Sequence, residues 1–309
     1  MCGIVGLFLK AERLEPDLGR LTALMLHEMR DRGPDSAGFA IYGEGGTAHK
    51  VSVMAADGES RDWAALAARA EAGLESAGPG AAVTARRVSD HAILETAGDP
   101  AALRHWLLDN EPGLTVLATG RRIELYKGVG DPDRVAARFG LEGRSGSHAI
   151  AHTRMATESA VTIAGSHPFS TGADTCLVHN GSLSNHNWLR LDLEREGERF
   201  QTENDSEVAA AYVAAHMRRG RDLKSALEAA IADLDGFYTF AVGTADGFAV
   251  LRDPIACKPA VIAETDDWVA MSSEFRAIAR LPGVGHAEIW EPEPGIVYSW
   301  SRDRGEAAA

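Results

Sequence analysis

The second residue of the chain is a cysteine, and this position gives it a specific chemical option. If Met1 is removed, Cys2 becomes the first residue and carries both a thiol and an α-amine. An α-amine has a pKa of roughly 7.7–8.0, so it can take the thiol proton near neutral pH and later return it to a leaving group. Gly3 and Gly6 permit close backbone approach around the thiol. A small buried residue at the start of a core strand is the simpler interpretation of Met-Cys taken alone.

A second group of polar residues lies in the segment 152–157, which reads His-Thr-Arg-Met-Ala-Thr and is expected at the end of a strand. The planar guanidinium of Arg154 can grip a substrate carboxylate through two parallel hydrogen bonds. The hydroxyl of Thr157 could add a further contact. Taken alone, a strand-end arginine in a surface salt bridge is an equally ordinary interpretation.

Two further sites follow along the chain. Asn180 and Gly181 offer a side-chain N–H and a backbone N–H, a compact pair of donors for an oxyanion. Asn-Gly is also a common turn signal, which is the alternative interpretation. Asp205, at the start of a predicted helix, could bind an ammonium group or could only complement the helix dipole. Together with Cys2 and Arg154, these residues describe a site for a zwitterionic amino acid whose side-chain carbonyl faces a thiol. Glutamine fits that description.

The segments that must position these residues alternate between strands and helices. Apolar patterning predicts helices at 17–30, from 204 onward and at 222–234. It predicts strands at 1–8, 37–42, 123–126, 149–152, 175–179, 237–242, 248–252, 261–263 and 268–271. Asn204, followed three residues later by Glu207, fits a capping box. This pattern favours a layered α+β domain with mostly antiparallel sheets.

The part of the chain from about residue 60 to 120 is harder to interpret. Ala-rich helical stretches at about 63–74 and 100–108 surround a Gly-Pro-Gly loop. We therefore expect a single domain over 1–309 that carries an insertion or lobe at about 45–120.

Composition limits the partners of the protein. The 309 residues carry a net charge of −14, which argues against nucleic acid or an anionic membrane surface as a partner. No signal-peptide pattern and no apolar run of bilayer-spanning length is present. Cys2, Cys176 and Cys257 are too far apart to suggest a disulfide framework or a metal site. We expect a cytoplasmic protein without a metal, in which Cys176 and Cys257 are core residues.

Several ordered motifs resemble a known family. They cover nearly the whole chain apart from roughly 45–120, and they comprise Met-Cys-Gly-Ile-Val-Gly at 1–6, Arg-Gly-Pro-Asp-Ser-Ala-Gly at 32–38, His-Thr-Arg at 152–154, His-Asn-Gly at 179–181, Asn-Asp-Ser-Glu at 204–207, Arg-Asp-Pro at 252–254, Lys-Pro at 258–259 and Ser-Ser-Glu at 272–274. In this order they resemble the class II glutamine amidotransferases, which belong to the N-terminal-nucleophile hydrolases. The resemblance implies a four-layer αββα sandwich.

The resemblance also implies roles for the residues around the thiol. Cys2 would be the nucleophile, with its own α-amine as general base. Asn180 and Gly181 would form the oxyanion hole, and Arg32 would brace the nucleophile loop.

The remaining motif residues would bind the substrate. Arg154 and Thr157 would hold the glutamine carboxylate, and Asp205 would hold its ammonium group. Two positions depart from the family pattern. Met155 stands where many relatives have an aromatic residue, so closure of the pocket over the substrate is in doubt. Lys258 stands where the late motif usually has arginine, and we expect this difference to be structural.

The resemblance extends to the partners. Relatives that use the released ammonia normally carry a synthase domain on the same chain, for which 309 residues leave no room. A separate chain of this length resembles the first subunit of N-methylglutamate synthase, whose partner chains are built like glutamate synthase and carry flavin and iron–sulfur groups. We therefore expect a hetero-oligomer with a synthase partner and no cofactor on this chain. The alternatives are a stand-alone γ-glutamyl amidohydrolase and a non-catalytic regulatory or scaffolding subunit.

Overall fold

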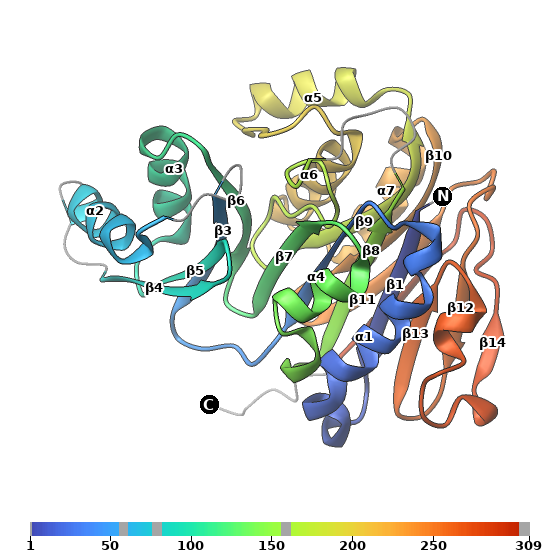
Figure 1. The fold of residues 1–309 in the computed structure, drawn as a ribbon. Helices are drawn as coiled ribbons and strands as arrows, with labels where there is room; N and C mark the ends of the chain where they lie inside the picture. The colour runs from blue at the N-terminus through green and yellow to red at the C-terminus, as the bar shows by residue number, and fades with distance from the viewer. Residues whose placement is uncertain (1, 56–60, 76–81, 156–161, 303–309) are drawn as a thin grey trace, which may run out of the picture.

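The computed structural model describes residues 2–55, 61–75, 82–155 and 162–302, and its main body contains two antiparallel β-sheets (Figure 1). The larger sheet has the strand order β14-β12-β13-β1-β8-β2-β7. In chain order its strands are β1 (Gly3–Leu9), β2 (Ser36–Tyr42), β7 (Ile123–Val129), β8 (His148–Arg154), β12 (Val261–Glu264), β13 (Trp268–Ser272) and β14 (Glu288–Trp290). The smaller sheet has the order β15-β11-β10-β9. Its strands are β9 (Cys176–Leu183), β10 (Gly236–Gly243), β11 (Gly247–Arg252) and β15 (Val297–Ser301).

Strand β1 lies inside the larger sheet and is buried on both faces. Val5 and Leu7 point into the core that faces helices, whereas Ile4 and Phe8 point into the core between the two sheets. This is the two-residue alternation of a strand. At Gly6 an added Cβ would lie 2.6 Å from the Phe248 ring of the other sheet, so glycine lets the two sheets pack closely here.

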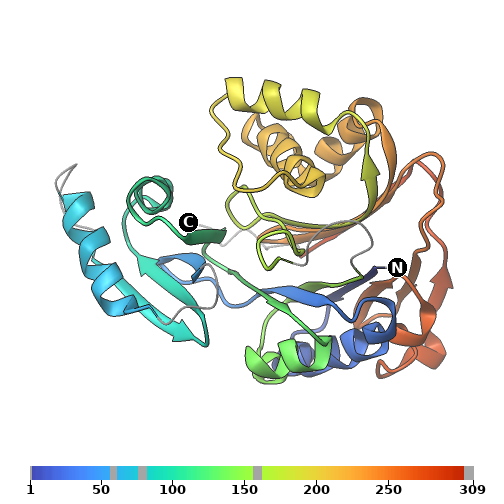
Figure 2. The ribbon, with the colours of Figure 1, turned by 45° about the horizontal axis from the view of Figure 1, so that its top comes forward.

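Helices cover the outer face of each sheet (Figure 2). Outside the larger sheet lie α1 (Leu18–Glu28), α4 (Pro132–Arg138) and α8 (Phe275–Ile278). Outside the smaller sheet lie α5 (His186–Arg195), α6 (Asp205–Arg218) and α7 (Leu223–Asp233). Short 3-10 helices are η1 (Glu12–Asp17), η2 (Arg30–Arg32), η4 (Leu141–Gly143) and η5 (Val284–His286). The predicted α+β fold, a four-layer αββα sandwich, is confirmed.

A third sheet forms a lobe beside the sandwich (Figure 1). It contains β3 (His49–Ala55), α2 (Trp63–Glu75), β4 (Val83–Val88), β5 (His91–Thr96), α3 (Pro100–Asn110) and β6 (Leu114–Gly120). Along the chain these elements form a βαββαβ unit, and the strand order in the sheet is β4-β5-β3-β6. This is the split βαβ arrangement of ferredoxin-like folds. The lobe packs its helices onto its own apolar core. It occupies the segment in which the sequence predicts an insertion, and the division of the chain into domains stays a prediction.

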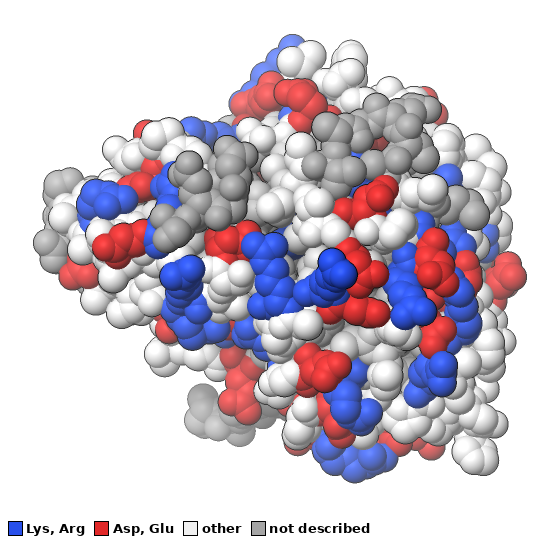
Figure 3. All heavy atoms as spheres, in the orientation of Figure 1, with Lys and Arg blue, Asp and Glu red and all other residues white. Residues whose placement is uncertain are grey.

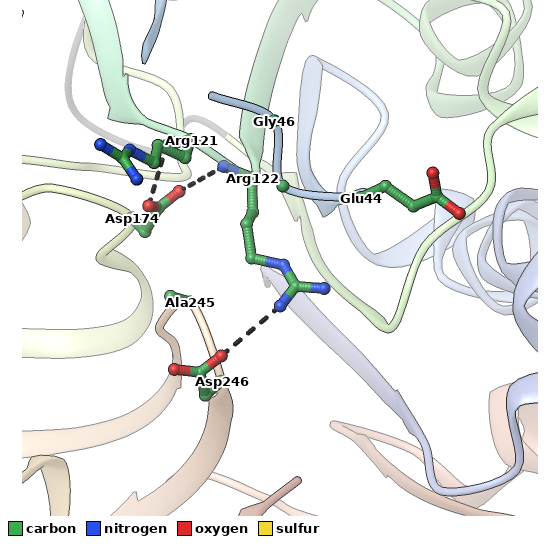
Figure 4. A pocket seen from close by; sticks show the side chains of 8 residues that line it. Glu44, Gly46, Arg121, Arg122, Asp174, Ala245 and Asp246 are labelled. Carbon is green, nitrogen blue, oxygen red and sulfur yellow. Dashed lines mark hydrogen bonds and ion pairs between the residues drawn. The ribbon is translucent and has the colours of Figure 1, made fainter. Parts of the chain in front are cut away.

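The base of the lobe is fixed by Asp174 (Figure 4). The Asp174 carboxylate accepts hydrogen bonds from the backbone N–H groups of Arg121, Arg122 and Ile123 at 2.8–2.9 Å. The Arg122 guanidinium reaches Asp246 at 3.5 Å across a hollow of about 560 Å³. The chain that leaves β6 is therefore tied to the sandwich at the point where it enters β7.

The predicted capping box is half right. The Asn204 side chain accepts from the backbone N–H of Ser206 at 2.9 Å, which confirms the N-cap. Glu207, however, does not turn back to Asn204. Its carboxylate accepts from the backbone N–H groups of Gln201 (2.9 Å) and Thr202 (2.8 Å). The acidic residue therefore holds the segment that precedes the helix.

The prediction for the two later cysteines is right for one and wrong for the other. Cys176 begins β9 and is buried, whereas Cys257 is exposed. Cys257 lies in a loop after β11, where the Asp253 carboxylate accepts from the backbone N–H groups of Ile255 and Ala256. This turn places the following thiol outside the core.

The surface shown in Figure 3 mixes acidic and basic side chains, so on this face the negative net charge is not gathered into one patch. In the described part of the chain, none of the helices combines the length and the apolar character that a bilayer-crossing helix needs.

Candidate active site

Cys2 lies at the entrance to β1 and is held through its backbone. Its carbonyl oxygen accepts from Arg32 Nε at 3.1 Å and from Asn180 Nδ2 at 3.3 Å. The thiol makes one long contact, 4.0 Å from Sγ to the carbonyl oxygen of Met155. The residue is partly exposed, so the thiol is accessible from outside while its backbone is anchored.

Arg32 is itself fixed by a carboxylate. Its side chain is 10% exposed and pairs with Glu274, which also binds Arg276 at 2.8 Å. At Gly33 an added Cβ would lie 2.5 Å from the backbone nitrogen of Arg154, so glycine lets this turn lie against the end of β8. Arg32 thus lies against the backbone of Cys2 and is fixed by Glu274, and its bracing role stays a prediction.

Asn180 projects from β9, in the other sheet, toward Cys2. Its Nδ2 donates to the Cys2 carbonyl and, at 3.2 Å, to Ser273 Oγ. Its Oδ1 faces His152 Nε2 at 3.0 Å. Gly181 follows with φ of +143°, and an added Cβ would lie 1.9 Å from the carbonyl oxygen of Phe237. This position therefore requires glycine.

The orientation of the Asn180 amide follows from the protonation state of His152. Burial lowers the pKa of His152 to about 3, so the imidazole is neutral near pH 7. A neutral imidazole with its hydrogen on Nε2 donates to Asn180 Oδ1 and leaves both Nδ2 hydrogens directed toward Cys2 and Ser273. His152 thereby keeps the Asn180 N–H groups directed at the backbone of Cys2 and at Ser273.

Arg154 and Asp205 line one cleft of about 570 Å³, within the size range of small-molecule sites. Arg154 ends β8, where the pairing of Gly3 with Thr153 brings it beside Cys2. The cleft is also lined by Thr162, Ala164, Gly165, His186, Gln201, Thr202, Glu203 and Asn204. Arg154 and Asp205 thus face one cleft from segments far apart in the sequence, and the pairing of β1 with β8 places Cys2 beside Arg154. The predicted Thr157 lies outside the described residues.

Asp205 does more than complement a helix dipole. Its Oδ2 accepts from the backbone N–H of Leu183 at 2.9 Å, which joins α6 to the end of β9. Its Oδ1 lies 3.8 Å from His179 Nδ1. Burial lowers the pKa of His179, which disfavours a charged ring beside Asp205, and the Ser206 hydroxyl lies 3.3 Å from the same carboxylate oxygen.

From the sequence we assign no catalytic role to the histidines, yet three of them are buried next to Asn180 and Ser206. His167 Nε2 and His179 Nδ1 both contact Ser206 Oγ, at 2.8 and 2.9 Å, and the His152 and His167 rings are 4.2 Å apart. Burial also lowers the pKa of His167 well below its usual value. The Ser273 hydroxyl oxygen accepts hydrogen bonds from Asn180 Nδ2 and from the backbone N–H of Ile4. The sequence indicated Ser273 only as part of a motif. The signal that could have identified these histidines and Ser273 is that they lie within or near the sequence motifs. Within the described ranges, no three His, Cys, Asp or Glu side chains are grouped as metal ligands.

Known proteins of similar sequence and fold identify the family of the chain. A family model described as a glutamine amidotransferase domain matches residues 152–280. The glutamine amidotransferase-like protein GlxB of Rhizobium meliloti is 55% identical over 98% of this chain and 99% of its own length. A putative glutamine amidotransferase of Methanothermobacter thermautotrophicus is 33% identical over 96% of this chain and 99% of its own length.

Among solved structures, the glutamine phosphoribosylpyrophosphate amidotransferase from B. subtilis matches with a TM-score of 0.58 and 22% identity, over 97% of this chain and 47% of that chain. That likeness concerns the fold alone. The two sequence relatives extend over almost the entire chain, and the sandwich carries the thiol, the amide donor and the cleft at one end. The chain therefore belongs to the class II glutamine amidotransferases, enzymes with the N-terminal-nucleophile hydrolase fold.

Proposed function

We propose that this chain is a cytoplasmic glutaminase subunit in which Cys2, after removal of Met1, cleaves the side-chain amide of glutamine. The observation that carries the proposal is the contact between Asn180 Nδ2 and Cys2 beside a cleft lined by Arg154 and Asp205. The two charged residues suit the carboxylate and ammonium of an amino acid. A side-chain carbonyl that extends from them toward Cys2 would meet the thiol and the amide donor together.

The reaction follows from these positions. The Cys2 α-amine takes the thiol proton, and Sγ attacks the side-chain carbonyl carbon of glutamine. The oxygen becomes an oxyanion that Asn180 Nδ2 and the Gly181 N–H stabilise. The carbon–nitrogen bond then breaks as the amine returns its proton, which releases ammonia and leaves a γ-glutamyl thioester. Water hydrolyses the thioester to glutamate and regenerates the thiol.

We further propose that the ammonia passes to a synthase on a separate chain, as in N-methylglutamate synthase or a glutamate synthase-like complex. Two relatives matched over 99% of their own length support an enzyme unit of this size. In such a hetero-oligomer the flavin and iron–sulfur groups would be on the partner.

The test is intact mass measured before and after treatment with a diazoketone analogue of glutamine, a reagent that alkylates the glutamine-site nucleophile. We expect loss of Met1 and one adduct. The adduct should be absent in Cys2→Ala and present in Cys257→Ala, the matched control that removes an exposed thiol. Excess glutamine should slow the labelling.

Two outcomes would contradict the proposal. Retention of Met1 would remove the proposed base, and labelling that persists in Cys2→Ala would place the nucleophile elsewhere. If Cys2 is the labelled residue, a copurification experiment distinguishes the two remaining hypotheses. A stable complex with a flavoprotein would support a glutaminase subunit that serves a synthase. Full turnover of γ-glutamyl amides by the isolated chain would instead favour a stand-alone amidohydrolase.

A further inference from the structure

The lobe contacts the sandwich at a second place, away from its base. The Gln201 side chain donates through Nε2 to the carbonyl oxygen of Val116 at 2.7 Å and accepts through Oε1 from the backbone N–H of Val116 at 2.9 Å. Val116 belongs to β6, an edge strand of the lobe sheet. An edge strand has backbone groups without a neighbouring strand. The amide of Gln201, the only glutamine in the chain, pairs with the edge as a neighbouring strand would.

The segment that carries Gln201 is also a wall of the substrate cleft. Gln201, Thr202 and Glu203 line the cleft together with Asp205, which we propose binds the substrate ammonium. Both polar atoms of the Gln201 side chain are bonded to the lobe, so its contribution to the cleft is to place the backbone rather than to present its own amide.

The same segment is fixed from the opposite side by α6. Glu207, which is buried, accepts from the backbone N–H groups of Gln201 and Thr202 and from the Thr202 hydroxyl. The wall is thus held between a lobe strand and the helix turn that carries Asp205. A shift of the lobe relative to α6 must move this segment or break one of the two sets of hydrogen bonds.

We propose that Gln201 is a positioning residue through which the inserted lobe sets the shape of the glutamine cleft. This inference rests on the proposed function of that cleft. It assigns the lobe a role in substrate affinity. It also predicts that occupation of the cleft and docking of the lobe strengthen each other, because coupling between two sites is reciprocal.

The first test compares labelling of Cys2 by the diazoketone in the wild type and in Gln201→Ala. Loss of the bridge should raise the concentration for half-maximal labelling rate by about tenfold, the scale of one or two hydrogen bonds. The maximal labelling rate should change less than about twofold, since Cys2 and Asn180 do not contact the bridge. Gln201→Glu, which keeps the size but loses the donor to Val116, should behave like Gln201→Ala.

Asp109→Asn is the matched control. Asp109 pairs with Arg199 at 2.8 Å across the same lobe–sandwich contact, but both side chains are largely exposed, so this pair should contribute little. An equal effect of Asp109→Asn would overturn the assignment to Gln201. The assignment would also be overturned if Gln201→Ala kept the wild-type affinity for the diazoketone, or if Gln201→Glu behaved like the wild type.

Hydrogen exchange tests the coupling without chemistry at Cys2. In Gln201→Ala the backbone amides of 202–205 should exchange faster than in the wild type. In Cys2→Ala, saturating glutamine should slow exchange at the Val116 amide, whose hydrogen bond goes to Gln201. Unchanged exchange in both experiments would refute the inference. Absence of Cys2 labelling in the wild type would instead refute the proposed function, and the Gln201→Ala exchange would still test the lobe contact.

Discussion

Replacement of Asn180 by alanine tests the proposed oxyanion hole most directly. In the resting structure both Nδ2 hydrogens are engaged by long hydrogen bonds, at 3.3 Å to the Cys2 carbonyl and 3.2 Å to Ser273 Oγ. To stabilise an oxyanion, Nδ2 must exchange one of these bonds for a charge-assisted one. The loss of rate in Asn180→Ala therefore reflects the free energy of the bond to the oxyanion minus that of the resting bond that it replaces.

The magnitude can be estimated from that exchange. Removal of one oxyanion donor costs about 2.7–4 kcal/mol in the transition state. The bond given up is worth about 0.5–1.5 kcal/mol. The net loss in Asn180→Ala should be roughly 2–3 kcal/mol, or about 30- to 150-fold in kcat. KM should stay within about threefold because, in the proposed function, Arg154 and Asp205 hold the amino-acid end of the substrate.

The assay is steady-state ammonia release, with Asn180→Asp as the companion variant. Aspartate keeps an acceptor for His152 but places a negative charge at the oxyanion, so its loss of kcat should be greater. Alanine leaves His152 Nε2 without its partner and should lower the free energy of unfolding by about 1–3 kcal/mol, so assays belong below the melting range of the variant. A loss confined to KM, or a kcat within threefold of wild type, would refute the role of Asn180.

Three further outcomes are expected. Arg154→Lys should raise KM for glutamine about tenfold or more in steady-state kinetics, since lysine cannot form the bidentate grip; an unchanged KM would contradict carboxylate binding. Gly181→Ala should lower the free energy of urea unfolding by about 3 kcal/mol or more, because its Cβ would lie 1.9 Å from the Phe237 carbonyl oxygen. Burial lowers the pKa of His148 to about 3, so as pH falls below about 6.5 the unfolded state binds the proton first. His148 should thus cost up to about 1.4 kcal/mol of stability per pH unit between about pH 6.5 and 3, and His148→Gln should flatten that slope in urea titrations.

Local patterns were sufficient to predict most strands and helices of the main body, whereas the four-layer sandwich was implied by the resemblance to the family. The alternation of Val5 and Leu7 against Ile4 and Phe8 marks a strand buried on both faces, and it needs no tertiary information. The Asn204 cap is likewise a contact between residues two positions apart. Most of the lobe strands were missed because alanine-rich stretches between 60 and 120 obscure the strand pattern. Helix α5 was missed because Leu189, Leu191 and Leu193 alternate with polar residues, a spacing typical of a strand.

The supporting contacts of the site could not be predicted in the same way. His152 and Asn180 are 28 residues apart, and Arg32 and Glu274 are 242 apart, so no spacing in the sequence indicates that they meet. The hydrogen bonds of Glu207 could not be predicted from spacing either, although its partners are close in the sequence. Its spacing from Asn204 fits a capping box, but the segment at 201–202 offers it two backbone donors, and the tertiary path of the chain decides the outcome.

The proposed nucleophile and oxyanion donor belong to different sheets, and this has a consequence for the whole core. Cys2 precedes β1 in the larger sheet, whereas Asn180 is in β9 of the smaller one. The hydrogen bonds that Asn180 donates to Cys2 and accepts from His152 therefore cross the interface between the sheets. Close packing there, as between Gly6 and Phe248, sets the separation of the sheets and with it the distance between thiol and amide. If Cys2 and Asn180 have the proposed roles, we therefore expect substitutions in the inter-sheet core to lower the rate as well as the stability, because a thicker core moves the thiol and the amide apart.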